Sequence, residues 1–128
     1  QAHILLIDQN ELSRLILKHQ LEKLGCVVAE ASRFQDALLV LRDKTSDLIL
    51  IDAVLIEASS QSVITEIRAL QSAGHGPQTA LIAVGRSASA TATVLQGVDA
   101  QLQKPVSTLE LAQMVDRWRG PIDPNVQK

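Results

Sequence analysis

The 128-residue sequence has few aromatic residues and a single cysteine. It contains one Trp, one Phe and no Tyr, so it offers no stacking platform of the kind that single-stranded nucleic-acid binders use. The single cysteine, Cys26, excludes an internal disulfide and favours a reducing compartment. We expect Cys26 to be packed and chemically inert.

Long apolar runs and a large excess of one charge are also missing. No run approaches the roughly 20 apolar residues that a membrane-spanning helix needs, and the first residues lack the pattern of a signal peptide. The formal net charge of −2 gives no basic surface for nucleic acid or anionic membrane. We therefore expect a cytoplasmic domain that contacts neither. Because the only methionine is Met114, we expect a domain cut from a longer protein, which could be the cytoplasmic part of a membrane-bound sensor.

Metal and nucleotide signatures are weak as well. The histidines, His3, His19 and His75, lie in different segments without the spacing of zinc ligands. The segment after the first apolar run, "DQNELS", contains no glycine-rich phosphate loop, which argues against a dinucleotide or flavin site.

What the sequence does contain is a regular alternation. Apolar runs cover 3–7, 26–31, 48–51, 79–84 and 100–103, and segments with helical periodicity cover 11–24, 33–43, 60–72, 87–96 and 108–119. This order predicts an α/β fold with a doubly wound parallel sheet of five strands. The runs 3–7 and 48–51 are continuously apolar, as in central strands, whereas "AQLQ" at 100–103 alternates and is typical of an edge strand.

Helix ends and the domain boundary can also be read from the sequence. Ser107 and Glu110 have the spacing of a capping box, and Gly25 lies where a helix C-terminal cap is expected. The segment 87–96 is rich in Ser and Thr and is the weakest helix candidate. We expect residues 1–119 to form one domain and residues 120–128, with two prolines, to form a tail or linker.

Three charged residues follow apolar runs: Asp8 after the first, Asp52 after the third and Lys104 after the fifth. Ligands of open parallel sheets bind beyond the carboxyl ends of the strands. If these side chains converge there, two carboxylates face one ammonium group. Such a cluster can hold a hard cation together with an anionic oxygen group.

Three stretches then identify a family. "ILLIDQNELSRLILKHQLEKLG", "LILIDAVL" and "LQKPVSTLELAQMV" occur in this order within the fivefold alternation. Together they resemble the receiver domains of two-component response regulators, over about residues 3–119. The first helical segment and "KPVSTLEL" are most similar to receivers attached to hybrid histidine kinases. The resemblance implies a flavodoxin-like (βα)5 fold with strand order 2-1-3-4-5.

The resemblance also implies a role for each charged residue. Asp52 matches the phosphoacceptor, which attacks a phosphoryl group on the histidine of a partner kinase. Mg²⁺ would be held by Asp8, Asp52 and the backbone carbonyl of Val54. Lys104, with the Mg²⁺, would neutralise the charge that phosphorylation adds. Pro105 matches the proline after that lysine, which implies a cis Lys104–Pro105 bond.

Several positions depart from the family pattern. Gln9 stands in place of the second acidic residue, and because it brings no charge we expect Mg²⁺ binding to be weaker by about 100-fold. Gly85 replaces the Thr or Ser hydroxyl that binds the phosphoryl group and relays its presence, and Gln101 replaces the aromatic residue of the fifth strand. The segment after Asp52 lacks the usual Met-Pro and Asp-Gly pairs; in their place are Leu55-Ile56 and Ser59-Ser60.

Three functions remain open. We favour a degenerate receiver, a pseudo-receiver in which Lys104 permanently neutralises Asp8 and Asp52 and which has no independent enzyme activity. It would bind a kinase, an output domain or another receiver through the face of 87–96, 100–103 and 108–119, and a homodimer is an open alternative. The second function is a working receiver that accepts phosphate on Asp52 and slowly dephosphorylates itself. The third is a structural spacer in a multidomain sensor. Trp118 could cover the core or belong to an interface.

Overall fold

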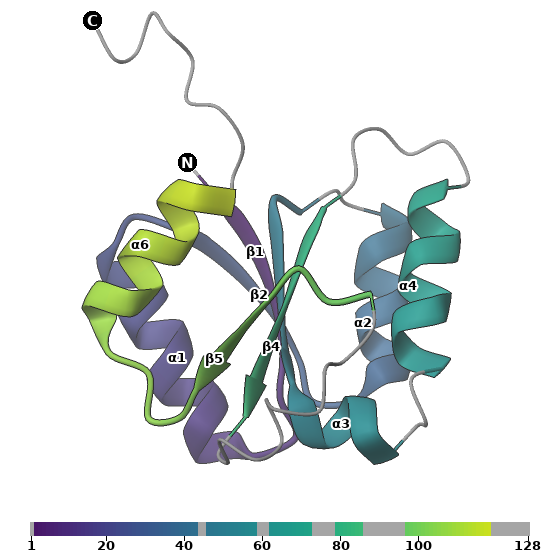
Figure 1. Cartoon of the computed structure of the whole chain (residues 1–128), viewed down its shortest axis with the longest axis horizontal. Helices are drawn as coiled ribbons and strands as arrows, with labels where there is room; N and C mark the ends of the chain where they lie inside the picture. The colour runs from purple at the N-terminus through teal and green to yellow at the C-terminus, as the bar shows by residue number, and fades with distance from the viewer. Residues whose placement is uncertain (1, 44–45, 59–61, 73–78, 86–96, 119–128) are drawn as a thin grey trace, which may run out of the picture.

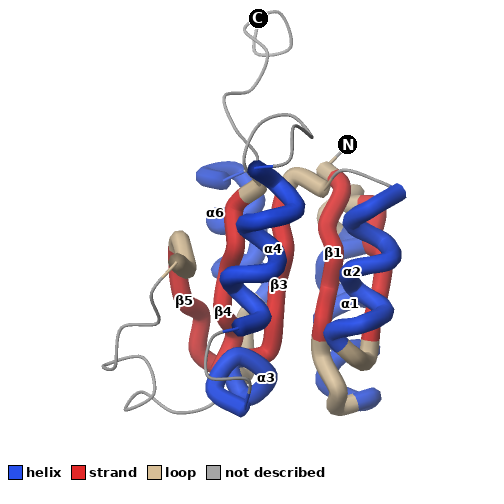
Figure 2. Tube along the Cα trace, turned by 90° about the vertical axis from the view of Figure 1, so that its right-hand side faces the viewer, coloured by secondary structure: helices blue, strands red, loops and turns tan. Residues whose placement is uncertain are grey.

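The computed structural model describes residues 2–43, 46–58, 62–72, 79–85 and 97–118, and it contains a five-stranded parallel sheet. The strand order is β2-β1-β3-β4-β5, which confirms the predicted topology (Figure 1). The strands are β1 (His3–Ile7), β2 (Val27–Ala31), β3 (Leu48–Asp52), β4 (Ala80–Gly85) and β5 (Ala100–Gln103). Strand β5 lies at one edge of the sheet (Figure 2), as its alternating sequence predicted.

Helices cover both faces of the sheet. Helices α1 (Glu11–Lys23) and α6 (Thr108–Trp118) lie on one face, and α2 (Phe34–Asp43), α3 (Ala53–Ala58) and α4 (Ser62–Ser72) lie on the other (Figure 1). The helix expected at 87–96 and the tail at 120–128 fall outside the described residues. Within the described ranges, no helix has the length and hydropathy that crossing a bilayer requires.

Helix α3 was not predicted from the sequence. It begins directly after β3, and the Asp52 side chain accepts a hydrogen bond from the Val54 backbone N–H at 3.0 Å. This is the contact of an N-cap residue, which satisfies one of the backbone donors at the start of a helix. The short helix is also anchored by Ala53 and Ile56, both buried beneath it. Asp52 therefore ends one element and caps the next.

The side chains of the central strands alternate between two apolar clusters. Ile4 and Leu6 of β1 pack under α1 and α6, whereas Leu5 and Ile7 pack under α2, α3 and α4. Strand β3 is buried along its whole length, in register with β1 and β4. Burial on both faces explains why these strands read as unbroken apolar runs.

The predicted helix ends are confirmed. The Ser107 backbone N–H donates to Glu110 Oε1 at 3.1 Å, and the Glu110 N–H donates to Ser107 Oγ at 3.0 Å, a reciprocal capping box at the start of α6. Gly25 follows the last residues of α1 with a φ of +86°. This left-handed conformation is the one that a glycine after a helix accommodates easily.

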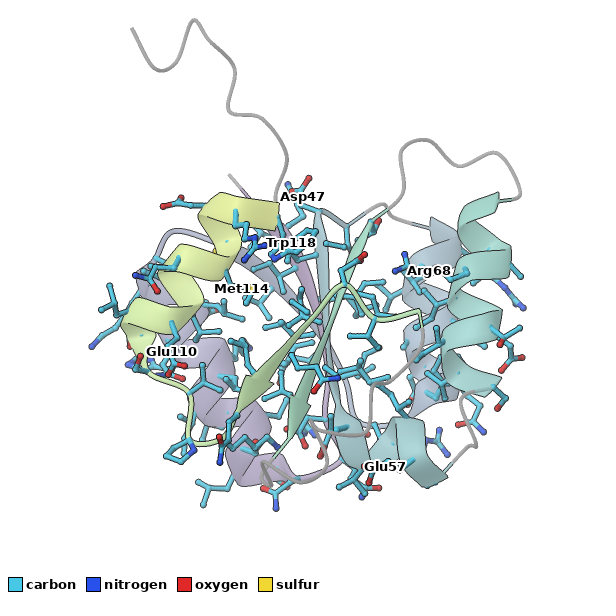
Figure 3. The ribbon with its side chains drawn as sticks, in the orientation of Figure 1. Asp47, Glu57, Arg68, Glu110, Met114 and Trp118 are labelled. Carbon is cyan, nitrogen blue, oxygen red and sulfur yellow. The ribbon has the colours of Figure 1, made fainter. Side chains whose placement is uncertain are left out.

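Cys26 and Trp118 both belong to the core under α1 and α6. Cys26 is buried, as expected. Trp118 is partly buried and packs with Met114 against the same cluster (Figure 3). The Arg117 guanidinium lies over the Trp118 ring, 5.2 Å from its centroid, which is a cation–π contact. Trp118 therefore contributes to covering the core, and the interface role stays a prediction.

Candidate functional site

Asp8, Asp52 and Lys104 meet at the carboxyl end of the sheet. Lys104 Nζ lies 3.0 Å from Asp8 Oδ2 and 3.6 Å from Asp52 Oδ2. Asp8 follows β1, Asp52 ends β3, and Lys104 follows β5, so Lys104 reaches past the end of β4 to meet them. The Lys104 backbone N–H donates to Gly85 O at 2.6 Å, and this bond holds the Lys104 backbone against the end of β4. The peptide bond between Lys104 and Pro105 is cis.

The Asp8 carboxylate is almost fully enclosed and receives three donors. Its side chain accepts hydrogen bonds from the Asn10 backbone N–H at 2.9 Å, Ser13 Oγ at 2.8 Å and Lys104 Nζ at 3.0 Å, and the residue is 1% exposed. Burial alone would raise the pKa of Asp8, but the bonds from Asn10, Lys104 and Ser13 outweigh it and lower the pKa below its ordinary value. Asp8 is therefore an ionised carboxylate with little unused hydrogen-bonding capacity.

Asp52 is less well compensated. It is 7% exposed, and among the described residues its hydrogen-bond donor is the Val54 N–H, with Lys104 at the longer distance of 3.6 Å. Burial raises the pKa of Asp52, the Val54 N–H and Lys104 lower it, and the neighbouring charge of Asp8 raises it again, with a net increase. The ammonium group is shared unequally, so the ionised form of Asp52 is less well stabilised than that of Asp8.

A second network supports Asp8 from the side of β2. Arg14 Nη1 donates to the Asp8 carbonyl oxygen at 2.7 Å, and Arg14 Nε pairs with Glu30 Oε1 at 3.2 Å. Glu30 also pairs with Lys18 Nζ at 2.8 Å. Ser13, Arg14 and Glu30 were not predicted from the sequence. The one available signal concerned Glu30: Arg14 and Lys18 are like charges four residues apart on one helix, which is unfavourable unless an acidic side chain faces them.

An open groove of about 730 Å³ lies beside Asp52. One wall comes from α1 and the other from the segment between β5 and α6, and the floor includes Asp52 and Lys104. The lining residues are Gln9, Asn10, Leu12, Ser13, Ile16, Leu17, Gln20, Asp52, Val54, Lys104, Pro105 and Val106. Asp52 is thus buried by its neighbours but can be reached from this groove.

Of the positions that depart from the family pattern, Gln9 and Gly85 lie at this site, whereas Ser59 and Ser60 fall outside the described residues. Gln9 is exposed and lines the groove. Gly85 ends β4, and a Cβ placed on it would lie 3.1 Å from Ala53 Cβ, so the first turn of α3 leaves little room for a side chain. Gln101 lies on β5 beside Ala83 of β4 and is half-buried.

The site offers oxygen ligands of the kind that a hard cation prefers. These are the carboxylates of Asp8 and Asp52 and the side-chain carbonyl of Gln9. Among the described residues no group of three or more His, Cys, Asp or Glu side chains could hold a metal ion. Val54 is the second residue of α3, where a backbone carbonyl normally accepts from the N–H group four residues later. The donor set therefore fits Mg²⁺ chemically, but Asp8 and Asp52 already have other partners.

Comparison with known proteins identifies the family. Residues 4–116 match the model of the response regulator receiver domain. The chain is 28% identical over 120 residues to the sensor histidine kinase GacS of Pseudomonas protegens, covering 91% of this chain and 13% of that protein. It is 30% identical over 118 residues to an uncharacterised 14.6 kDa protein of Leptolyngbya boryana, covering 92% of this chain and 90% of that protein.

A solved structure agrees in both fold and family. The receiver domain of the sensor histidine kinase PA1611 from Pseudomonas aeruginosa PAO1, with a magnesium ion coordinated in its active-site cleft, superposes with a TM-score of 0.74 at 27% identity. The match covers 94% of this chain and 98% of that one. With its strand order, its Asp8–Asp52–Lys104 cluster and the match over residues 4–116, the chain belongs to the response regulator receiver domain family of two-component signalling.

Proposed function

We propose that this receiver domain is degenerate and regulates signalling by protein–protein interaction, without efficient phosphorylation. The observation that carries the proposal is the contact of Lys104 Nζ with Asp8 at 3.0 Å and with Asp52 at 3.6 Å. An ammonium group already lies between the two carboxylates that a metal would need. Because Gln9 is uncharged, the site has no third negative charge with which to hold Mg²⁺ and the Lys104 ammonium group together.

Weak Mg²⁺ binding follows from the same geometry. We propose Asp8, Asp52 and the Val54 carbonyl as the ligands. An ion at Asp8 competes with Ser13 and Lys104 for its oxygens, and an ion at Asp52 competes with the Val54 N–H. Each displaced charge-assisted hydrogen bond is worth roughly 1.5–3 kcal/mol, which is enough to lower the affinity considerably.

Loss of the family's relay supports the same function. Gly85 has no hydroxyl to bind a phosphoryl group, and Gln101 has no aromatic ring to report the change. A ligand shifts a conformational equilibrium only if it binds one state better than the other. Phosphorylation of Asp52 would therefore have little influence on a distant surface through these two positions.

We also propose a parent protein and a class of partner for this domain. This chain spans 13% of GacS, and by analogy we propose one domain, residues 1–119, of a hybrid histidine kinase, with 120–128 as a linker and a cytoplasmic location. The partner would be a histidine kinase, an output domain or another receiver. The face expected from the sequence combines residues 87–96, β5 and α6, of which 87–96 lie outside the described residues.

Phosphodonor treatment tests the proposal directly. The domain is incubated with Mg²⁺ and acetyl phosphate, or with Mg²⁺ and beryllofluoride, and followed by intact mass and by amide NMR shifts. We expect little modification and small shifts. The isosteric Asp52→Asn variant provides the background, because it has the same shape without the nucleophile. Stoichiometric modification that is absent from Asp52→Asn would refute the proposal.

A working receiver is the second candidate, favoured by the access of the groove to Asp52. In that function an Asp52 oxygen forms a bond to phosphorus while the phosphorus–nitrogen bond of a partner's phosphohistidine breaks and the imidazole leaves. Transfer from a phosphorylated kinase at ordinary Mg²⁺ would establish this function. The absence of transfer even at high Mg²⁺ would exclude it.

A further inference from the structure

The guanidinium group of Arg68, on α4, joins three segments at the edge of the sheet where the strands begin. Its Nη1 donates to the Thr79 carbonyl oxygen at 2.8 Å, and its Nη2 donates to the Gly97 carbonyl oxygen at 2.8 Å and to Asp99 Oδ2 at 3.0 Å. Thr79 precedes β4, and Asp99 precedes β5. We call this set of contacts the Arg68 clasp. It lies away from the arrowheads of β4 and β5, at the edge opposite to the candidate functional site (Figures 1 and 3).

The clasp continues into the pairing of β5 with β4. Asp99 Oδ2 accepts a second hydrogen bond, from the Leu81 backbone N–H at 2.8 Å, and the Asp99 N–H donates to the Leu81 carbonyl oxygen at 2.8 Å. The turn before β5 also packs closely on α4, because a Cβ on Gly97 would lie 2.6 Å from Ile64 Cγ2. Backbone bonds, a carboxylate and a helix contact therefore fix the start of β5 together.

Strand β5 contributes little to its own position along β4. It has four residues at the edge of the sheet, and within the described residues it pairs with β4 alone. Of the four, only Leu102 is buried. Strand register is strongly specified where a full apolar face is buried and weakly specified where few apolar side chains contribute. The position of β5 therefore depends on the contacts at its two ends.

The other end of β5 leads directly to Lys104. The Lys104 backbone N–H donates to Gly85 O at 2.6 Å, and Lys104 Nζ lies 3.0 Å from Asp8 Oδ2 and 3.6 Å from Asp52 Oδ2. A shift of one residue along a strand is about 3.3 Å, as large as these contacts themselves. A displacement of β5 would therefore withdraw the ammonium group from both carboxylates.

We propose that Arg68 is a positioning residue for Lys104. Its clasp holds β5 where Lys104 contacts Asp8 and Asp52, and it thereby controls the access of Mg²⁺ to both carboxylates from the opposite edge of the sheet. When the clasp is broken, β5 opens more often and the carboxylates become available to a cation. The inference rests on the proposed function, in which Lys104 weakens Mg²⁺ binding, and it names how that site is regulated.

Native-state hydrogen exchange tests the coupling without a metal. The Asp99 and Lys104 amides report the two ends of β5, and the Leu50 amide of the central strand β3 reports global unfolding. In the native chain we expect Asp99 and Lys104 to share one opening free energy, below that of Leu50. In Arg68→Met we expect both amides to exchange about tenfold faster relative to Leu50. Faster exchange at Lys104 cannot be a local effect, because Lys104 lies at the far end of the strand.

The affinity for Mg²⁺ is the second readout, followed by amide NMR shifts. We expect Arg68→Met to bind Mg²⁺ about fivefold more tightly than the native chain. A purely structural role would lower stability without strengthening binding. Should Arg68→Met fail to fold, Asp99→Asn keeps the shape of the side chain without its charge, and it should change both readouts in the same direction by a smaller factor.

Asp47→Asn is the matched control for Asp99→Asn. Asp47 precedes β3 at the same edge of the sheet, its Oδ2 accepts from the His3 backbone N–H at 2.7 Å, and its own N–H donates to the His3 carbonyl oxygen at 2.7 Å. This arrangement repeats that of Asp99 with β4, but it involves neither β5 nor Arg68. We expect Asp47→Asn to leave the Mg²⁺ affinity and the relative exchange of the β5 amides unchanged.

Several results would overturn the inference. These are different opening free energies for Asp99 and Lys104, faster exchange confined to Asp99, an unchanged Mg²⁺ affinity in Arg68→Met and Asp99→Asn, and an equal gain in Asp47→Asn. The phosphodonor experiment separates this failure from failure of the proposed function. Little phosphorylation together with an unchanged Mg²⁺ affinity would reject only this inference, whereas stoichiometric phosphorylation of the native chain would reject the proposed function.

Discussion

Lys104 approaches Asp8 more closely than Asp52, at 3.0 Å against 3.6 Å, although both carboxylates are buried. The difference follows from the partners of each acid. Asp8 is held in position by Asn10 and Ser13, whereas Asp52 is turned toward the N–H of Val54. A single ammonium group thus stabilises two carboxylates unequally.

Removing this ammonium group should strongly destabilise the fold. In Lys104→Met two neighbouring carboxylates remain buried without a cation, and breaking a buried ion pair costs about 3–5 kcal/mol. We expect a loss of that order in the free energy of unfolding, measured by urea denaturation at pH 7. Lys18→Met is the control, because it removes an ammonium group from a surface pair with Glu30 and should change much less. Partial recovery in Lys104→Met/Asp8→Asn would support the mechanism, and a wild-type stability for Lys104→Met would contradict it.

The two carboxylates should affect the pH dependence of stability in opposite directions. The folded pKa of Asp52 is raised above its ordinary value of 3.8, so its contribution is fully present below that pH and is lost as the pH rises through the raised pKa. Replacing it with Asn removes this loss. We expect the free energy of unfolding of Asp52→Asn, relative to that of the native chain, to increase as the pH rises from 3.8 through the raised folded pKa, as measured by urea denaturation.

Asp8→Asn should change the pH dependence of the free energy of unfolding in the opposite direction. The folded pKa of Asp8 is lowered from 3.8, so its contribution is present above that value and is lost as the pH falls through the lowered pKa. The variant should therefore be less stable than the native chain at pH 7 and approach it in strong acid. Parallel curves for the two variants would show that the carboxylates do not differ in this way.

Restoring the missing carboxylate should strengthen metal binding. Gln9 lines the groove, and Gln9→Asp adds a charge near Asp8 and Asp52. We expect Mg²⁺ to bind about 100-fold more tightly, as one unit charge at about 4 Å and partial desolvation suggest. The measurement is a Mg²⁺ titration followed by amide NMR shifts. Gln35→Asp, which adds the same charge on α2, is the control, and equal affinities of the two variants would refute the expectation.

Restoring a hydroxyl at position 85 should require a second change. A Cβ on Gly85 would lie 3.1 Å from Ala53 Cβ, and overpacking of this kind costs about 1–3 kcal/mol. We expect Gly85→Ser to lower the free energy of unfolding and Ala53→Gly/Gly85→Ser to show a favourable coupling in a double-mutant cycle. Additive effects of the two substitutions would mean that Ala53 does not restrict position 85.

Two glycines with the same backbone conformation should differ in their tolerance of alanine. Gly25 and Gly97 have φ values of +86° and +87°, but only at Gly97 would a Cβ meet another residue, Ile64 Cγ2 at 2.6 Å. Gly25→Ala should cost about 1–2 kcal/mol from the backbone alone. Gly97→Ala should cost more, and Ile64→Leu, which removes Cγ2, should reduce the difference. Equal thermal stabilities of the two alanine variants would contradict the clash.

The elements and the meeting of the three charged residues could be predicted because they depend on local patterns. The unbroken apolar run at 48–51, the alternation at 100–103 and the Ser107–Glu110 spacing each report directly on burial or capping. The carboxyl ends of parallel strands share one edge, which brings Asp8, Asp52 and Lys104 together.

The remainder depends on contacts between distant segments. The unequal sharing of Lys104 is set by Ser13 and by Val54, neither of which is distinctive in the sequence. The approach of Ala53 to Gly85 joins the ends of two neighbouring strands and has no local signature. Helix α3 was missed because six residues are too few to show helical periodicity, and an acid that caps it looks the same as an acid that does chemistry.

That cap connects the charge on Asp52 to a surface element without positions 85 and 101. A cation or phosphoryl group that engages the Asp52 oxygens competes with the Val54 N–H for them. An N-cap bond contributes about 0.5–2 kcal/mol, and a helix of six residues has few other bonds with which to resist fraying. A ligand bound to Asp52 would thus fray the first turn of α3, and that turn would persist when Asp52 is free. A partner could detect the difference at Val54, which is exposed.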